Sequence, residues 1–276
     1  MRIVDTHCHL IYRERLRYPW LDGDTRLNRD CTVEDYLPQA RAAGITDVLH
    51  MEVDVAPGDI EAEAALTGGL GVPFVGTIAG CRPESADFPA QLERLASIPG
   101  VKGLRRILHT QPDGLAQTAL FAENLGRLAR YGLSFDFCVL PRQIPIAVAL
   151  ARACPDVQFV LDHCGVPDVK AAGLDPWRAG IRAIAELPNV AAKLSGIVAY
   201  ADPVNWTVAD LRPFAEHVIG SFGWERMVWG SDHPVCTRSA SLGRWMDATH
   251  ALLAGASETE KGALLGLNAL RIYRLG

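Results

Sequence analysis

The chain has 276 residues, of which 49% are hydrophobic and 21% are charged, and its formal net charge is −5. This is the composition of an ordinary globular protein, and neither charge sign is concentrated in a tail or a stripe. We therefore do not expect nucleic acid or an anionic membrane as a partner.

The first residues lack the apolar stretch and cleavage site of a signal peptide, and no segment has the apolar length that spans a membrane, so we expect a cytoplasmic protein. The seven cysteines are an odd number without Cys-x-x-Cys spacing, which favours reduced thiols over a disulfide framework. No linker-like composition divides the chain, and we expect one domain over residues 1–276. The sequence leaves the oligomeric state open, with a homo-oligomer as one option.

Short apolar runs rich in β-branched residues alternate along the chain with amphipathic segments. The runs predict strands over Arg2–Thr6, Thr46–Met51, Pro73–Thr77, Val101–Arg106, Leu133–Phe137, Val157–Leu161, Val190–Leu194 and Met227–Ser231. The amphipathic segments predict helices over Val33–Ala43, Gln91–Ala96, Ala116–Tyr131, Ile144–Ala153, Trp177–Glu186, Val208–Ile219 and Leu242–Leu253. This alternation predicts an α/β fold, a parallel eight-stranded (β/α)8 TIM barrel. An open Rossmann sheet is disfavoured because His7-Cys8-His9 stands where that fold needs Gly-x-Gly-x-x-Gly.

The connection after the first predicted strand is unusually long. It includes the aromatic Tyr18–Leu21 cluster and the charged Asp22–Asp30 stretch. Long connections that carry aromatic residues often form lids or pocket walls, and others are plain surface loops, so both interpretations stay open. Trp20 is our candidate for a substrate contact in this loop.

Two histidines end the first predicted strand. Because side chains alternate along a strand, we expect Asp5, His7 and His9 on one face, with both imidazoles directed into the same space. Taken alone, the pair is either decoration on a surface hairpin or a ligand pair for a metal or a reacting carbonyl. Cys8 is expected to face the opposite side as a buried wall thiol.

Two later strands also end in residues that carry chemistry. His163 shares its parity with Phe159 and Leu161 on the sixth strand, and Asp232 shares its parity with Val228 on the eighth. The carboxyl ends of barrel strands meet at one rim, where we expect these residues to join the histidine pair. Separately, His163 could be a core histidine and Asp232 a helix cap, but together they favour a functional site.

Cationic residues lie on two other predicted strands. One of Arg105 and Arg106 should face the rim, where a guanidinium can hold a carboxylate or polarise a carbonyl; alternatively, both are solvated or pair with helix carboxylates. Lys193 lies in a strand covered on both sides, where an unpaired ammonium is costly. We expect Lys193 at the rim beside acceptors, with pairing inside the wall as the alternative.

The loops after the last two strands supply further candidates. Tyr200 and Trp206 are either pocket walls or packing residues. His233 has the opposite parity to Asp232, which favours a supporting or wall position over metal ligation.

The segments Asp5–His9, His163 and Gly230–Asp232 at the ends of the first, sixth and eighth strands resemble the amidohydrolase superfamily. More narrowly, four segments resemble its lactonase branch, which includes enzymes that open L-fuconate, L-rhamnonate and pyrone-dicarboxylate lactones. These segments are Tyr18–Trp20, Lys102–His109, Leu161–Pro167 and Lys193–Gly196. The resemblance covers nearly the whole chain and implies a hydrolase acting on a small-molecule lactone. It favours Arg105 and His109 as substrate contacts, which join Trp20, Lys193 and Tyr200 in our predicted set.

The chain also departs from the wider superfamily. Many members have a histidine at the end of the fifth strand, and binuclear members have a carboxylated lysine or a glutamate at the end of the fourth. Here the fifth strand continues Leu133–Cys138 without histidine, and Lys102 lies at the start of the fourth. A binuclear centre is therefore not supported. One divalent ion, zinc by preference, has the candidate ligands His7, His9, His163 and Asp232. The lactonase branch also resembles enzymes that work without metal, so metal-independent catalysis stays open.

Our first hypothesis is hydrolysis of a sugar-derived 1,4- or 1,5-lactone to the hydroxy acid. Asp232 would act as general base toward water and then return the proton to the ring oxygen. Zinc, or His163 and the other histidines together with Arg105, would stabilise the oxyanion. One alternative is a metal-dependent, non-oxidative decarboxylase of the same superfamily, and another is a catalytically silent barrel that binds a small acid.

Overall fold

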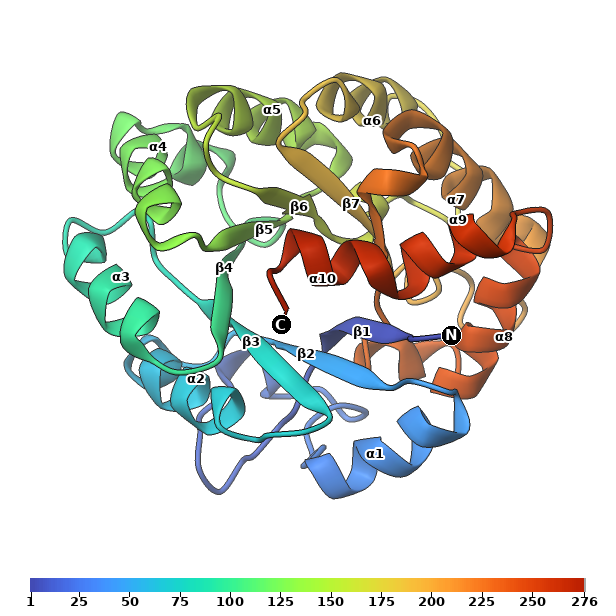
Figure 1. Ribbon diagram of the computed structural model, residues 1–276, viewed down its shortest axis with the longest axis horizontal. Helices are drawn as coiled ribbons and strands as arrows, with labels where there is room; N and C mark the ends of the chain where they lie inside the picture. Colours follow the sequence, from blue (N-terminus) through green and yellow to red (C-terminus); the bar gives the residue numbers. More distant parts are fainter. Residues whose placement is uncertain (276) are drawn as a thin grey trace.

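The computed structural model describes residues 1–275, and its centre is an eight-stranded parallel sheet in the order β1 to β8. The sheet curves until β1 meets β8, where Cys8 forms a bridge with His233 and the Asp232 N–H donates to the His7 carbonyl at 2.7 Å. Helices surround the strands (Figure 1). The strands are β1 Val4–Cys8, β2 Asp47–Met51, β3 Phe74–Gly80, β4 Val101–Ile107, β5 Ser134–Cys138, β6 Phe159–Leu161, β7 Val190–Leu194 and β8 Met227–Trp229. The predicted TIM barrel is confirmed.

Each predicted helix has a counterpart in the structure. The α-helices are α1 Val33–Ala42, α2 Ile60–Gly68, α3 Phe88–Ser97, α4 Ala119–Gly126, α5 Ile144–Ala153, α6 Trp177–Ala185, α7 Val208–Phe222, α8 Leu242–Leu252, α9 Glu258–Gly262 and α10 Asn268–Ile272. Sequence reasoning missed α2, α9 and α10. It also made the α4 region too long, because 3-10 turns flank that helix at Asp113–Gln117 and Arg127–Tyr131. The predicted helix-stop residues Gly44 and Gly132 have φ angles of 75° and 64°, which favour glycine.

Apolar side chains pack on both sides of the sheet. The larger cluster fills the space between strands and helices, and the smaller one lies inside the barrel, where it includes Val4, Val160 and Val228. The C-terminal helix α10 crosses the barrel opening beside the chain end in Figure 1, and the following Tyr273 belongs to the interior cluster. This end of the barrel is therefore closed by packing, which leaves the carboxyl ends of the strands for a site.

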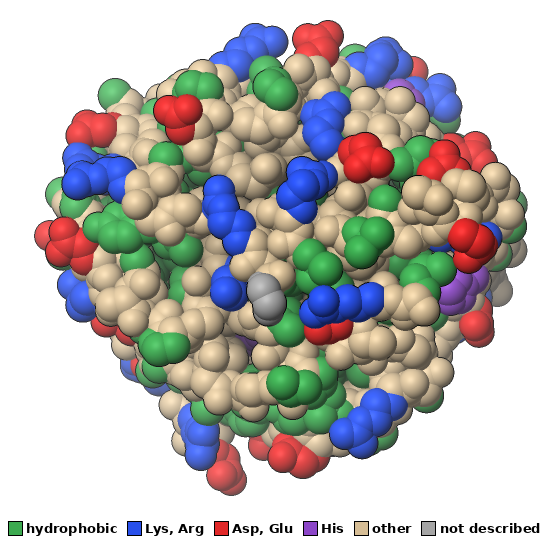
Figure 2. Space-filling view, viewed as in Figure 1, with side chains coloured by type: hydrophobic (Ala, Val, Ile, Leu, Met, Phe, Trp, Pro, Cys, Tyr) green, Lys and Arg blue, Asp and Glu red, His purple; other side chains and the backbone are tan. Residues whose placement is uncertain are grey.

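The surface carries charge of both signs. Figure 2 shows acidic and basic side chains interspersed over the face on which both chain ends lie. Over residues 1–275, none of the helices combines the length and the apolar character needed to cross a bilayer.

The first strand does not alternate as the sequence predicts. Asp5 pairs with Val48 but Cys8 pairs with His50, so β1 has one residue more than β2 over this stretch, which is the signature of a bulge. Asp5 faces α1, where it accepts a hydrogen bond of 2.6 Å from the Tyr36 hydroxyl. The prediction that Asp5 shares a face with the histidines is therefore wrong, because the bulge shifts the strand's alternation.

The sixth strand also departs from the expected alternation. Phe159 and Leu161 belong to the outer apolar cluster, and Val160 is the interior residue. Asp162 is consequently the next interior side chain, not His163. His163 still reaches the barrel mouth because it has φ +53° and the next residue, Cys164, has φ +54°. The predicted placement of His163 holds, but for a different reason, and the eighth strand alternates as predicted, with Val228 inside.

Candidate active site

A cavity of about 280 Å³ opens at the carboxyl ends of the strands, at the other end of the barrel from α10. Its polar wall contains Asp232 after β8, His9 after β1, His163 after β6 and Arg105 on β4. The full lining is His9, Ile11, Trp20, Glu52, Val53, Asp54, Arg105, Ile107, His109, Thr110, Cys138, His163, Tyr200, Asp232, Pro234 and Val235. The barrel topology thus brings residues far apart in the sequence to one small site.

Three imidazoles surround one oxygen of Asp232. The Nε2 atoms of His9, His7 and His163 lie 3.5, 3.8 and 4.0 Å from Asp232 Oδ1. All four residues are buried. The four candidate metal ligands of the sequence analysis therefore converge in the structure.

Hydrogen bonds orient two of these rings. His9 Nδ1 lies 3.0 Å from the carbonyl oxygens of Met51 and Glu52, so Nδ1 carries the proton and Nε2 presents a lone pair to the cavity. His163 Nδ1 lies 2.9 Å from the Ser195 hydroxyl. Gly196 makes this contact sterically feasible, because a Cβ there would lie 2.3 Å from His163 Nδ1.

The ionisation of the cluster follows from its surroundings. Burial lowers the pKa of both His7 and His163. Burial alone would raise the pKa of Asp232, but His163, His9 and Arg105 outweigh it, so the net shift is downward. Near neutral pH the site therefore contains a carboxylate beside the neutral imidazoles of His7 and His163, which suits a proton acceptor or a cation.

The donor set fits a single divalent cation. His7 Nε2 and Asp232 Oδ2 are buried atoms without a hydrogen-bond partner in the described residues. His9 directs a bare Nε2 toward a carboxylate oxygen, a contact that a cation between the two atoms would make favourable. His7, His9 and Asp232 bring one ligand atom each within 4.8 Å of one another, and so do His7, Asp162 and His163. Nitrogen and oxygen donors of this kind suit zinc.

Below the histidines lies a fully buried layer of charges. Lys193 Nζ is 2.8 Å from Asp136 Oδ2 and 2.9 Å from Asp162 Oδ1. The Tyr273 hydroxyl donates to Asp136 Oδ2 at 2.8 Å. Burial alone would lower the pKa of Lys193, but the two carboxylates raise it overall, so Lys193 stays charged.

Lys193 does not line the cavity; it lies inside the barrel beneath His7. The expectation that it sits at the rim is wrong, and the alternative of pairing inside the wall describes its position. The sequence analysis also missed Asp136 and Asp162, which satisfy it. An acidic residue inside a predicted apolar strand, as in Phe135-Asp136-Phe137, was the available signal, because a buried carboxylate requires a partner.

The structure separates the two arginines of β4. Arg105 lines the cavity and contacts two carboxylates, Glu52 Oε1 at 3.1 Å and Asp162 Oδ2 at 2.9 Å. Arg106 instead pairs with Glu84 at 2.7 Å and lies outside the lining. Glu52, which the sequence analysis did not single out, follows β2 directly and is a further charged member of the site.

The other predicted substrate contacts lie at the cavity wall. Trp20 is 39% exposed and donates from Nε1 to the Val53 carbonyl at 2.7 Å, so part of the long first loop forms the rim. His109 and Tyr200 also line the cavity. The roles of these residues as substrate contacts remain predictions.

The supporting residues lie behind this wall. Trp206 is buried and donates to the Ser239 carbonyl at 2.9 Å. His233 stacks on Tyr36 with ring centroids 5.4 Å apart, and Cys8 is buried in the outer apolar cluster. None of these three side chains lines the cavity.

Residues 4–275 match the amidohydrolase family. The chain belongs to that family. The superfamily resemblance found in the sequence is thereby confirmed, and the match extends over nearly all of this amidohydrolase.

Its relatives include two L-fucono-1,5-lactonases. The amidohydrolase is 29% identical to an L-fucono-1,5-lactonase of Burkholderia multivorans, with 99% of this chain and 96% of the relative covered. It is 28% identical to an L-fucono-1,5-lactonase of Burkholderia ambifaria, with 70% and 68% covered. A crystal structure of a Burkholderia multivorans amidohydrolase with bound zinc covers 100% of both chains, at 26% identity and a TM-score of 0.91.

Proposed function

We propose that this amidohydrolase hydrolyses a neutral, sugar-derived lactone to its hydroxy acid. The observation that carries the proposal is the buried Asp232 carboxyl group, which lies 3.5 to 4.0 Å from three imidazole nitrogens at a small cavity that Arg105 also lines. The similarity to two L-fucono-1,5-lactonases supports the same reaction class.

The charges of the cavity favour a neutral substrate. The only cationic side chain among the described lining residues is Arg105, and Glu52 and Asp162 already balance it. A substrate with two carboxylates would face Asp232 and Glu52 without an unpaired guanidinium to hold it. A cavity of about 280 Å³ lies near the small end of ligand sites and suits a single sugar ring.

The reaction needs a base on one side of the carbonyl and charge stabilisation on the other. Asp232 Oδ2, which has no hydrogen-bond partner among residues 1–275, takes a proton from water as the water oxygen bonds to the lactone carbonyl carbon. The electron pair of the carbonyl moves onto its oxygen, and the N–H donors of Arg105 stabilise that oxyanion. The oxyanion then collapses, the bond to the ring oxygen breaks, and Asp232 returns its proton to that oxygen.

The wall residues position the sugar. The cavity lining combines His109 and Tyr200, which carry polar groups, with the apolar Ile11, Val53 and Ile107. Burial lowers the pKa of His109 to about 4, so its neutral ring acts through hydrogen bonds to hydroxyl groups.

A single divalent ion fits the same residues. His7, His9 and His163 would hold it through Nε2, and Asp232 through its carboxylate. A bound ion supplies Lewis-acid polarisation of the carbonyl oxygen. The zinc bound in the related Burkholderia multivorans structure supports this assignment.

The test is a panel of lactones with the purified enzyme, before and after dialysis against a chelator. Acid release would be followed with a pH indicator for neutral sugar 1,4- and 1,5-lactones and for a pyrone dicarboxylate lactone. We expect turnover of a neutral sugar lactone and none of the dicarboxylate. Absence of turnover on every lactone, or release of CO2 from an aromatic acid, would overturn the proposal.

A further inference from the structure

The ammonium of Lys193 has more acceptors around it than protons to give. Besides Asp136 Oδ2 at 2.8 Å and Asp162 Oδ1 at 2.9 Å, it lies 3.1 Å from His7 Nδ1 and 3.2 Å from the Thr6 carbonyl oxygen. An ammonium donates three hydrogen bonds and accepts none. The contacts with hydrogen-bond geometry are those to Asp136, His7 and Thr6, whereas Asp162 forms an ion pair without that geometry.

This arrangement constrains the protonation of His7. A nitrogen that faces an ammonium hydrogen must be an acceptor, and a charged imidazolium would oppose N–H to N–H. When Lys193 donates to this nitrogen, His7 is neutral with Nδ1 bare and its proton on Nε2. That Nε2 lies 3.8 Å from Asp232 Oδ1, which is too far for a hydrogen bond. In this tautomer it cannot ligate a metal.

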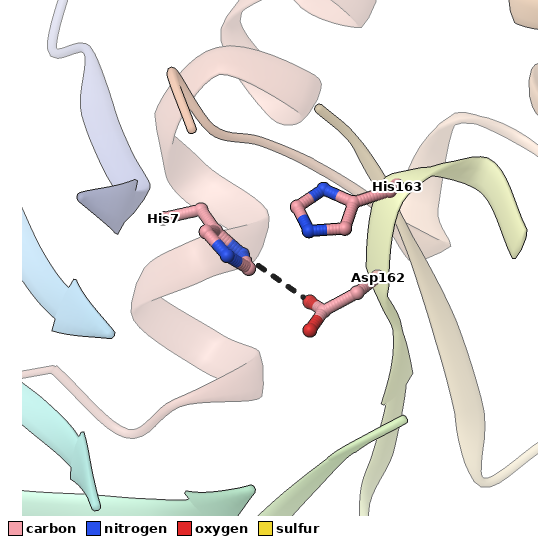
Figure 3. A group of neighbouring side chains, drawn as sticks. All are labelled: His7, Asp162 and His163. Atoms are coloured by element: carbon pink, nitrogen blue, oxygen red, sulfur yellow. Dashed lines mark ion pairs between the residues drawn. The ribbon is translucent and has the colours of Figure 1, made fainter. Parts of the chain in front are cut away.

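The opposite tautomer also has its partner in place. His7 Nδ1 lies 3.3 Å from Asp162 Oδ1, the pair joined in Figure 3. With the proton on Nδ1 directed at Asp162, Nε2 is bare, and Lys193 can turn its third N–H to the same carboxylate, 2.9 Å away. Both arrangements use buried atoms already in contact, so the exchange moves a proton rather than a side chain.

We propose that Lys193 and Asp162 select the tautomer of His7 and thereby set the metal affinity of the site. In the metal-free enzyme, Lys193 keeps the His7 proton on Nε2. When a divalent cation binds Nε2, the proton is on Nδ1, and Asp162 accepts a hydrogen bond from that N–H. Both are positioning residues, because neither lines the cavity. Lys193 weakens metal binding, and Asp162 strengthens it.

The primary test needs no substitution of Lys193 or Asp162. Metal-free wild-type protein labelled with 15N at histidine would be studied by NMR, since the shifts of the two ring nitrogens show which one carries the proton. His7 signals are assigned by their absence in His7→Gln. We expect the Nε2 proton without metal and the Nδ1 proton after addition of zinc. A metal-free His7 protonated on Nδ1, or on both nitrogens, would overturn the proposal.

Two variants should change the zinc affinity in opposite directions. Asp162→Asn is expected to weaken zinc binding about 10–100-fold, the usual effect of removing a partner of a ligating histidine. Lys193→Met is expected to strengthen zinc binding about tenfold, because the loss of one hydrogen bond to His7 Nδ1 corresponds to roughly a tenfold change in affinity. In the metal-free variant, the His7 proton should move to Nδ1. The double variant Asp136→Asn/Lys193→Met keeps the buried charge balanced should the single variant fail to fold.

Arg106→Met is the matched control, because Arg106 is a cation on a barrel strand that pairs with Glu84 outside the cavity. It should leave the zinc affinity and the His7 shifts unchanged. Weaker zinc binding in both the Lys193 and the Asp162 variants would indicate that the two residues only support the structure of the site. That result would contradict the proposal that they select the tautomer of His7. These measurements use no lactone, so they stand or fall separately from the proposed reaction.

Discussion

The barrel interior contains two charged layers that differ in how closely their opposite charges approach. Around Asp232 Oδ1, the nearest imidazole nitrogens lie 3.5 to 4.0 Å away, beside a cavity. One layer lower, Lys193 lies between two carboxylates, and the Tyr273 hydroxyl anchors one of them. Buried charges at such long distances are costly unless a ligand comes between them, so the upper layer is suited to chemistry. The lower layer holds the upper one in position.

The largest expected effect separates chemistry from folding at the upper layer. Asp232→Asn removes the general base but keeps the size of the side chain, so we expect lactone turnover to fall about 10²–10⁴-fold. The thermal unfolding midpoint should change far less, because Asp232 Oδ2 has no hydrogen-bond partner in the described part of the chain. Steady-state kinetics and a melting curve test this. Substantial retained turnover would remove Asp232 from the role of base.

The lower layer should behave in the opposite way. Lys193→Met leaves Asp136 and Asp162 buried without their ammonium, and removing one partner of a buried pair typically costs about 3–5 kcal/mol. We expect a loss of this size in the free energy of unfolding, measured by urea titration. Arg106→Met, at a pair that is less enclosed, is the control and should cost less. Equal losses of unfolding free energy in the two variants would mean that the lower layer contributes no more to stability than the Arg106–Glu84 pair.

Acid should weaken the wall of the upper layer. Burial, with a contribution from Arg105, lowers the pKa of His109 from 6.5 to about 4. The folded state therefore binds fewer protons than the unfolded state between these values, and stability is lost as the pH falls from 6.5 toward 4, by up to about 3 kcal/mol. His109→Gln should lack this part of the loss. Urea titrations at several pH values compare the two proteins, and identical pH profiles would contradict the assignment.

The smallest effect concerns the link between the lower layer and the C-terminal helix. Tyr273→Phe removes one hydrogen bond to Asp136, which is worth about 1 kcal/mol. Because Lys193 still holds the other charges, we expect kcat to remain unchanged while the unfolding midpoint falls slightly. A large fall in kcat would show that Tyr273 does more than anchor Asp136.

The fold and the meeting of four site residues could be predicted from the sequence. The alternation of strands and helices predicted the barrel, and strand ends predicted the meeting of His7, His9, His163 and Asp232. These succeed because a parallel barrel places every strand's carboxyl end at one rim. Side-chain direction was less predictable, since a single bulge in β1 turned Asp5 outward. A left-handed turn rather than strand parity brought His163 into the site.

The sequence by itself determined the fold class, the rim residues and the family, because periodicity and motif spacing are properties of the chain. Only the tertiary structure decided that Arg105 rather than Arg106 faces the cavity, and that Lys193 lies beneath it. It also revealed Asp136 and Asp162 as the partners of that lysine. The physical reason is that the position of a buried charged side chain depends on the opposite charges that contact it across the barrel. Those partners come from strands that are far apart in the sequence.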